Sequence, residues 1–380
     1  MKVVAMLDSF KGSVSSLEAG EAVSRGVLRA VPDAEISVFP LADGGEGTVD
    51  ALVYACRGER ITARVTGPLG QSVDAVYGIL PDNVAVIEMS AAAGITLLDV
   101  SSRDPMKTTT YGVGELILDA ISRGCRDFLI GIGGSATNDG GVGMLQALGF
   151  SFLNADGQEI LRGAEGLSSL ACIDLSSVLP VLRECRFRVA CDVTNPLCGP
   201  LGCSAVYGPQ KGATPHDIEK MDAWLAWYAA LTQDVLPLAD REAPGAGAAG
   251  GMGFALLSYL GAELTSGVSL VLDAMNAEAH MRDADIVVTG EGRMDGQSAM
   301  GKAPVGVAKL AKRYGKTVIA LAGSLSDDAA ACNGQGIDAC FSILQSVVTL
   351  DEAMEPSVAQ KNLEKTAEQA FRLIQAARRI

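Results

Sequence analysis

The chain has 380 residues, of which 48% are apolar and 20% charged, a composition typical of a globular protein with a sizeable core. At roughly 100–200 residues per domain, this length predicts two domains. The 30 Lys and Arg against 45 Asp and Glu give a net charge of −15, which argues against nucleic acid and an anionic membrane surface as partners. A small anionic substrate stays compatible with this charge, because a few local cations and backbone N–H groups can hold one.

Nine cysteines are scattered along the chain without a C-x-x-C pair, and only two histidines are present. A structural zinc site is therefore not expected. Free thiols and the lack of a signal-peptide pattern at the start favour a cytoplasmic protein. No apolar run reaches the ~20 residues that a membrane-spanning helix needs.

The beginning of the chain predicts strands and helices in alternation. Val3–Leu7 is a short apolar run that predicts a strand, and the loop DSFKG follows it. Ser15 and Glu18 have the spacing of a capping box, so we expect a helix from there until Pro32. Glu35–Pro40 predicts a second strand, which is followed by the loop LADGGEGT and another helix.

The middle of the chain has a different pattern. Residues 61–80 alternate apolar and polar side chains, which predicts antiparallel strands. A helix is expected over residues 107–124, and Phe128–Ile132 predicts a buried strand.

The last hundred residues return to alternating strands and helices. Asp285–Thr289 predicts a buried strand, and a long glycine-rich loop follows it. The elements expected after this loop are a helix at Ala303–Arg313, strands at Thr317–Leu321 and Cys340–Leu344, and a long helix at Ser357–Ile380. The pattern predicts an α/β protein with two domains: a doubly wound, Rossmann- or flavodoxin-like parallel sheet from residues 1–60 and 284–380, and a mixed α/β domain, 61–283, inserted into it.

Gly131–Gly141, with the sequence GIGGSATNDGG, follows a predicted strand and opens a helix. Its glycines can turn several N–H groups toward an anion. Ser135, Thr137 and Asn138 add side-chain donors, and Asp139 adds a carboxylate, none of which a plain turn needs, so we favour a ligand loop over a tight turn.

The same loop also satisfies the pattern G-x-G-x-x-A at Gly131, Gly133 and Ala136. Asp156 follows at about the place of an acid that binds the ribose of a dinucleotide. This spacing favours a dinucleotide enzyme as an alternative.

Two further glycine-rich segments are ambiguous. GAGAAG, residues 245–250, does not follow a strand and is either a flexible connector or a nucleotide-contacting loop. GQSAMGKA, residues 296–303, has the glycine and lysine spacing of a P-loop, but Ala303 replaces the Ser or Thr that would hold magnesium. Lys302 beside a helix N-terminus still suits a phosphate.

Carboxylates and cations recur in the loops that follow strands. They are Asp8, Lys11, Asp43, Glu46, Asp192, Asn195 (an amide), Lys211, Glu291, Arg293 and Asp295. In open α/β sheets, ligands bind outside the carboxyl ends of the strands. Carboxylates there can hold magnesium or accept a hydroxyl proton, and cations can neutralise a transferring phosphate. Each of these residues taken alone also fits a turn or a helix cap.

Together the motifs resemble the bacterial type I glycerate kinase family over essentially the whole chain. They are DSFKGS, PLADGGEGT, GGSATNDGG, CDVTNPLCGP, YGPQKGA, GAGAAGGMG and TGEGRMDGQSAMGKAP. The resemblance implies a kinase that transfers the γ-phosphoryl group of ATP to the 2-hydroxyl of D-glycerate, giving 2-phosphoglycerate and ADP. It also implies two domains with the active site in the cleft between them.

Phosphoryl transfer needs a phosphate cradle, magnesium, cations and a hydroxyl acceptor, and under this resemblance we assign residues to these roles. The expected ATP contacts are Gly133, Gly134, Ser135, Thr137, Asn138, Gly250, Gly251 and Lys302. The expected substrate contacts are Asp8, Ser9, Lys11 and Asn195. For catalysis, we expect Lys11 and Arg293 to hold the glycerate carboxylate or the γ-phosphate. Asp192 is the first choice for the general base, and Asp295 is the second. Asp43 or Glu291 is expected to hold Mg²⁺.

Two other functions are kept beside this one. The first is an NAD(P)-dependent oxidoreductase of a small hydroxy acid, which the G-x-G-x-x-A spacing suggests. The second is a two-lobed metabolite-binding protein without catalysis. Hydride transfer would identify the first, and glycerate binding without ADP release the second.

Overall fold

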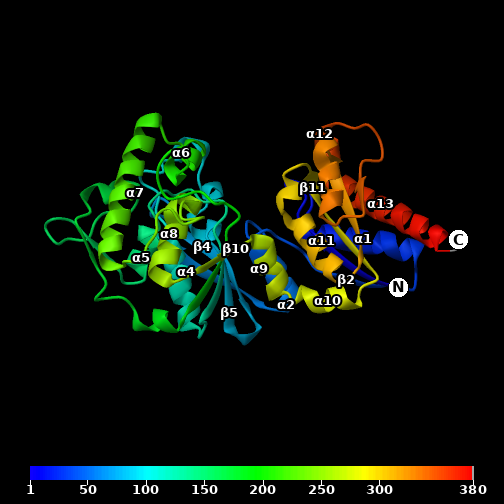
Figure 1. Cartoon of the computed structure of the whole chain (residues 1–380), viewed down its shortest axis with the longest axis horizontal. Coiled ribbons are helices and arrows are strands. Elements are labelled where there is room, and N and C mark those ends of the chain that lie inside the picture. The colour runs from blue at the N-terminus through cyan, green and yellow to red at the C-terminus, as the bar shows by residue number, and fades with distance from the viewer. Residues whose placement is uncertain (379–380) are drawn as a thin grey trace. The chain divides into compact units, whose positions relative to one another are not determined.

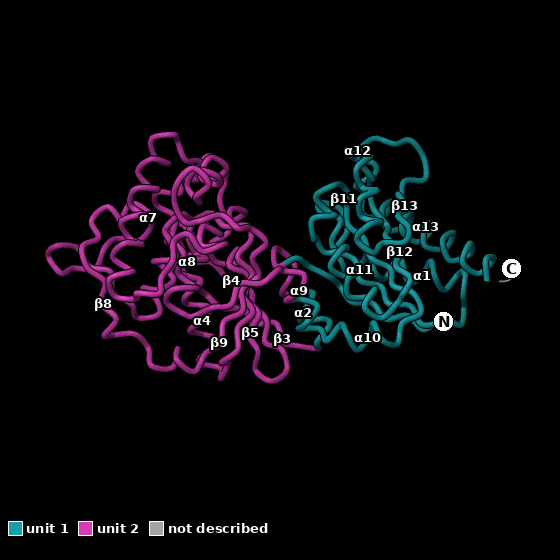
Figure 2. Tube along the Cα trace, viewed as in Figure 1, with its two compact units in different colours: residues 1–43, 50–56, 271–380 teal, residues 44–49, 57–270 magenta. Residues whose placement is uncertain are grey.

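A computed structural model describes residues 1–378 of the protein. They form two compact units (Figure 2). Unit 1 comprises residues 1–43, 50–56 and the chain from 271 on, and unit 2 comprises residues 44–49 and 57–270. The prediction that the last helix extends to Ile380 lies outside the described residues for its final two positions.

Unit 1 contains a five-stranded, entirely parallel sheet. Its strands are β1 (Lys2–Leu7), β2 (Glu35–Val38), β11 (Ile286–Met294), β12 (Thr317–Leu325) and β13 (Ala339–Ser342). In space their order is β13-β12-β11-β1-β2. Numbered along the chain within this unit, the order is 2-1-3-4-5, the flavodoxin-like arrangement, so the direction of winding reverses between β1 and β11.

Helices pack on both faces of this sheet (Figure 1). The helices of unit 1 are α1 (Ser16–Ala30), α10 (Ala277–Asp283), α11 (Ala303–Arg313), α12 (Leu350–Met354) and α13 (Pro356–Ala377). Side chains of α1 and α13 share one apolar core with Val3, Ala5 and Leu7 of β1. Helix α11 contacts β1, β11 and β12 but contributes no residue to that core, so it covers the opposite face. The predicted doubly wound sheet is therefore confirmed.

The start of α1 shows how local sequence sets an element. The Glu18 N–H donates to Ser15 Oγ at 3.3 Å, and the Ser15 N–H donates back to the Glu18 carboxylate at 3.0 Å. This reciprocal pair is the predicted capping box, and it satisfies two N–H groups that a helix start otherwise leaves unpaired.

Unit 2 contains a mixed six-stranded sheet with the order β10-β9-β6-β5-β4-β3. Its strands are β3 (Glu59–Thr66), β4 (Ser72–Leu80), β5 (Val84–Glu88), β6 (Asp127–Gly131), β9 (Arg186–Ala190) and β10 (Glu263–Thr265). Strands β3, β4 and β5 pair antiparallel, and β5, β6, β9 and β10 pair parallel. The spatial order follows the chain order, so this sheet has no reversal of winding.

The remaining elements of unit 2 build its core. They are α3 (Ser90–Ala93), α4 (Tyr111–Ser122), α5 (Val142–Ala147), α6 (Cys203–Tyr207), α7 (Pro215–Val235), α8 (Ala248–Leu260) and the antiparallel pair β7 (Ser151–Leu153) and β8 (Cys172–Asp174). Helices α2 (Thr48–Cys56) and α9 (Gly267–Ala274) have residues in both units. Tyr228 of α7 packs edge-to-face on Phe254 of α8, with ring centroids 5.4 Å apart.

One predicted loop is wrong. The glycine-rich segment after Thr289 was expected to be a loop, but β11 continues through it to Met294. The reason is β12, which runs beside it in parallel register, with Arg293 opposite Ser324. A Cβ atom on Gly323 would lie 2.4 Å from the Gly292 carbonyl oxygen, so the glycines permit this close pairing.

The nine cysteines are free thiols. Within residues 1–378, no helix combines the length and the apolar character that crossing a membrane requires.

Candidate active site

A pocket of about 490 Å³ opens at the carboxyl ends of the strands of unit 1. It is lined by residues that end or follow β1, β11, β12 and β13, and by residues of α12 and α13. The lining residues Asp8 and Glu291 come from β1 and β11, the two strands between which the winding reverses. Ligands of open α/β sheets bind at this point, because the loops diverge there and leave a crevice.

The loop after β1 presents an acid and a cation to this pocket. The Asp8 N–H donates to the Gly290 carbonyl at 2.9 Å, which extends the pairing of β1 with β11 by one residue. Phe10 and Val14 then exchange two backbone hydrogen bonds of 2.8 and 3.1 Å and close a tight turn. This turn buries Phe10 and leaves Lys11 exposed at its tip.

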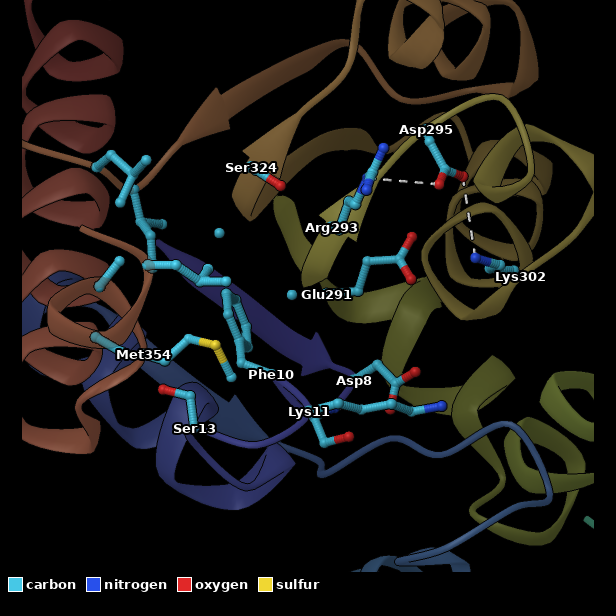
Figure 3. Close-up of a pocket in the computed structure, with 18 of the residues that line it drawn as sticks. Asp8, Phe10, Lys11, Ser13, Glu291, Arg293, Asp295, Lys302, Ser324 and Met354 are labelled. Atoms are coloured by element: carbon cyan, nitrogen blue, oxygen red, sulfur yellow. Dashed lines mark hydrogen bonds and ion pairs between the residues drawn. The ribbon is translucent and has the colours of Figure 1, made fainter. Parts of the chain in front are cut away.

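Four carboxylates line the pocket: Asp8, Asp43, Glu291 and Asp295. Burial, followed by the charge of Asp43, raises the pKa of Asp8 to about 7, although the Ser9 N–H and Lys11 oppose this rise. Burial likewise raises the pKa of Glu291, whose side chain is 8% exposed and accepts a 2.5 Å hydrogen bond from Ser298 Oγ. Figure 3 shows the carboxylates of Asp8 and Glu291 turned toward the same side of the pocket. Crowding of acids out of water favours a bound cation.

Two more cations border the same pocket and share one carboxylate. Asp295 lies 3.8 Å from the Arg293 guanidinium and 4.0 Å from Lys302 Nζ, as the dashed lines in Figure 3 mark. The Asp295 carboxylate also accepts the N–H groups of Gln297 and Ser298, which fixes its position. The side chains of Arg293 and Lys302 are 70% and 42% exposed, so both can still reach an anion.

Eight of the residues selected from sequence therefore meet in one pocket. They are Asp8, Ser9, Lys11, Asp43, Glu291, Arg293, Asp295 and Lys302. The other selected residues, from 133 to 251, all belong to unit 2.

In unit 2, the loop Gly131–Gly141 exposes its backbone at Gly133 and Gly134 only. The side chains that follow are buried and take partners inside the protein. Lys211 Nζ donates to Ser135 Oγ at 2.9 Å and to the Thr137 carbonyl at 2.6 Å, and Asn138 Nδ2 donates to Ser204 Oγ at 2.8 Å. Any ligand of this loop would therefore meet main-chain groups before these side chains.

Asp139 is the polar centre of this loop. Its carboxylate accepts from the N–H and Oγ1 of Thr110, at 2.8 and 2.9 Å, and from the N–H groups of Gly141 and Gly143. Burial raises the pKa of Asp139, and these four donors oppose the rise. The carboxylate thus ties the loop to the start of α4.

Gly250 and Gly251 pack against the same loop. Both have left-handed backbones, with φ of 71° and 91°, and the Gly140 N–H donates to the Gly250 carbonyl at 2.9 Å. A Cβ atom at Gly250 would lie 2.0 Å from the Thr137 carbonyl oxygen. The close approach of two backbones accounts for these glycines, and their predicted contact with ATP stays a prediction.

Asp192 and Asn195 follow β9. Asp192 is exposed, and its carboxylate accepts the Gly267 N–H at 3.1 Å. The amide of Asn195 donates to the Leu201 carbonyl at 2.8 Å and accepts from the Tyr207 hydroxyl at 2.7 Å. The Asn195 side chain thereby holds its own loop together.

Lys211 was noticed in sequence but not assigned a role. Its side chain is 2% exposed, and burial lowers the pKa of its ammonium group to about 8. The flanking residues Gly208 and Gly212 were a signal for a close turn, and Gly212 has a φ of 98°. Nothing in the local pattern showed that the side chain would point inward.

The dinucleotide alternative gains no support. Asp156 lies beyond α5, exposed in the turn after β7, where its N–H donates to Asn154 Oδ1 at 3.0 Å. Strand β7 belongs to the small antiparallel pair with β8. In a Rossmann unit, the ribose-binding acid follows the second parallel strand of the sheet. Asp156 instead follows a strand of an antiparallel pair, so it does not occupy that position.

The residues near the pocket suit magnesium held together with phosphate. Among residues 1–378, no three His, Cys, Asp or Glu side chains form a group that could hold a metal ion by themselves. Mg²⁺ in phosphoryl-transfer sites is usually bound through one or two carboxylates and the phosphates of the substrate. Asp43 and Glu291 can supply such a pair of carboxylates.

The fold and the pocket define a class: a doubly wound α/β protein that combines carboxylates and cations where its sheet reverses. Comparisons with known proteins narrow this class. The sequence model of the glycerate kinase family matches residues 3–375. The chain belongs to the glycerate kinase family.

Individual relatives agree. The chain is 51% identical to a glycerate 2-kinase of Escherichia coli (strain K12) over 354 residues, 93% of each chain. It is 50% identical to a glycerate kinase of Bacillus subtilis (strain 168) over 368 residues, 97% of this chain and 96% of the relative. A crystal structure described as glycerate kinase 2 from Salmonella typhimurium LT2 matches with a TM-score of 0.92 and 48% identity, covering 100% of both chains.

Proposed function

We propose that this protein transfers the γ-phosphoryl group of ATP to the 2-hydroxyl of D-glycerate, giving 2-phosphoglycerate and ADP. The observation that carries this proposal is the pocket of unit 1, in which four carboxylates and three cations meet at the reversal of the sheet. Membership of the glycerate kinase family supports the reaction, and the name of the E. coli relative supports the 2-position.

The three cations are suited to the anionic groups of the reactants. Lys11, Arg293 and Lys302 line the pocket, and each side chain is exposed. Arg293 can bind a carboxylate or a phosphate with two parallel hydrogen bonds, whereas a lysine acts as a point charge. We assign Lys11 and Arg293 to the glycerate carboxylate and the γ-phosphate, and Lys302, beside the N-terminus of α11, to the nucleotide phosphates.

The reaction releases one proton. The glycerate oxygen forms a bond to the γ-phosphorus while the bond from this phosphorus to the oxygen of ADP breaks, and the hydroxyl proton passes to a base. We assign this role to Asp8, because it lines the same pocket as Lys11 and Glu291, and because burial raises its pKa to about 7, which lets it accept a proton at neutral pH. Asp192, the first choice from sequence, stays a prediction, which a comparison of kcat between Asp8→Asn and Asp192→Asn tests.

Asp295 has a different role in this proposal. Its carboxylate is hydrogen-bonded to two backbone N–H groups and placed between Arg293 and Lys302. It therefore orients the two cations.

Asp43 and Glu291 would hold Mg²⁺, which when bound neutralises the charge of the phosphates. Ser9 supports Asp8 through its N–H, which donates to the carboxylate at 2.7 Å.

A direct assay tests the reaction. The protein is incubated with ATP, Mg²⁺ and D-glycerate, and the products are resolved by ³¹P NMR. We expect stoichiometric ADP and 2-phosphoglycerate. A 3-phosphate product would contradict the position, and absence of ADP release would contradict the kinase. Oxidation of NADH with a hydroxy-acid product would establish the oxidoreductase instead.

A further inference from the structure

The pocket of unit 1, about 490 Å³ in volume, has two ends of different chemistry. The charged residues described above account for one end of the pocket only.

The other end is apolar. Phe10, Ile343 and Ala359 are 4%, 3% and 2% exposed and form its buried wall. Met354 is half-buried beside them, and Leu350 is 73% exposed at the rim. Figure 3 shows Phe10 and Met354 on the side of the pocket away from Arg293, Asp295 and Lys302. Glycerate has no apolar surface with which to cover this end.

One polar group at the apolar end lacks a partner. Ser13 lines the pocket, and its hydroxyl oxygen is buried without a hydrogen-bond partner among the described residues. Buried hydroxyl groups are normally hydrogen-bonded, so an unpaired one calls for an explanation. Because this oxygen is closed off from solvent, a ligand edge with hydrogen-bonding atoms would reach it only after the Ser13 side chain rotates.

We propose that the apolar end of this pocket, formed by Phe10, Ile343, Leu350, Met354 and Ala359, binds the purine base of the nucleotide. Sites of this kind are largely apolar, with few polar groups that fix the orientation of the ligand. The flat base packs against Phe10 and the polarizable thioether of Met354, and covers Leu350. Its phosphate chain then extends toward Lys11, Arg293 and Lys302. This inference rests on the proposed kinase function, and it places the base in unit 1 rather than at the glycine-rich loop of unit 2.

Two substitutions test the base subsite. Ala353→Phe adds a ring to α12 at the pocket lining, and Met354→Ala removes a contact. The affinities of ADP and of tripolyphosphate, which carries no base, are measured by calorimetry in the presence of Mg²⁺. We expect each variant to weaken ADP about tenfold or more and to change tripolyphosphate by less than twofold. Leu373→Ala, an exposed leucine of α13 outside the lining, is the matched control and should change neither.

The outcomes are distinct. ADP affinity within twofold of the unmodified protein in both folded variants overturns the subsite, as does an equal loss for tripolyphosphate. Hydrogen exchange of the unmodified protein gives a second test without substitution: ADP should protect residues 8–14 and 343–359, and protection confined to residues 131–141 overturns the proposal. If the unmodified protein phosphorylates glycerate while the subsite test fails, the kinase stands; if it neither binds ADP nor releases it from ATP, both proposals fail.

Discussion

Lys211 is a buried lysine, and burial disfavours the charged form of its ammonium group. Burial lowers the pKa of its ammonium group from 10.5 to about 8, although it donates to Ser135 and Thr137. Between pH 8 and 10.5 the unfolded chain therefore binds more protons at this residue than the folded chain, so its contribution to stability rises with pH in this window. The rise has an upper limit of about 3 kcal/mol, from about 1.4 kcal/mol per pKa unit.

Lys211→Met removes this titration. We expect the free energy of unfolding of the unmodified protein, minus that of the variant, to increase as the pH rises from 8 to 10.5. Urea denaturation measures both free energies. Taking the difference between the two proteins cancels the other alkaline titrations. A difference that stays constant over this range, or that changes in favour of the variant, contradicts the buried, partly neutral lysine.

Asp139 is a carboxylate whose surroundings consist of donors. Asp139→Asn replaces one acceptor oxygen with an NH₂ group that faces N–H and O–H donors from Thr110, Gly141 and Gly143. We expect a loss of at least about 2 kcal/mol in the free energy of unfolding, because buried donors lose their partner. Asp156→Asn, in an exposed turn, is the control and should stay within about 0.5 kcal/mol. Equal stabilities of the two variants would contradict the structural role of Asp139.

At the residue scale, sequence located the pocket residues better than their chemistry. Asp8, Glu291 and Arg293 could be selected because each ends or follows a predicted strand. The inward orientation of Thr137 and Asn138, and the burial that shifts the pKa of Asp8, depend on segments far away in sequence. A loop pattern alone does not contain this information.

At the scale of elements, one glycine sets the distance between two helices. A Cβ atom at Gly26 of α1 would lie 2.1 Å from the Glu364 carbonyl oxygen of α13. Gly26→Ala should therefore force the helices apart and lower the free energy of unfolding by about 1–3 kcal/mol, a typical cost of overpacking. Thermal and urea unfolding measure it. Gly334→Ala, where nothing lies within 4 Å, is the matched control, and a loss no larger than that of the control would contradict the close packing.

Helix starts and strand ends differ in how well they could be predicted. The capping box of Ser15 and Glu18 is local, and it was found as predicted. Helix α11 begins and ends at the predicted residues, Ala303 and Arg313. The end of β11 was missed because Glu291–Met294 looks like a glycine-rich loop, and only pairing with β12 makes it a strand. Such pairing partners lie about thirty residues away in sequence.

At the scale of the whole molecule, alternating strands and helices at both ends of the chain were enough to predict the doubly wound sheet, and the different pattern of the middle was enough to predict a second, mixed α/β domain. The strand order was not predictable, because it depends on which strands pair in space. That order matters here, since the reversal between β1 and β11 places Asp8 and Glu291 in one pocket. The same pairing of β1 with β11 brings three cations to one pocket, although the chain carries a net charge of −15.

The central claim is that phosphoryl transfer takes place in the pocket of unit 1. The most direct test is to measure kcat of the Asp8→Asn variant with ATP and D-glycerate as substrates. Removal of a general base typically costs 10²–10⁴-fold, so we expect kcat of Asp8→Asn to fall by about this factor with an unchanged thermal midpoint. Asp192→Asn and Asp156→Asn, measured beside it, should stay within about fivefold of the unmodified protein. If Asp8→Asn keeps its kcat while Asp192→Asn loses it, the base lies in unit 2 and the account of the pocket is contradicted.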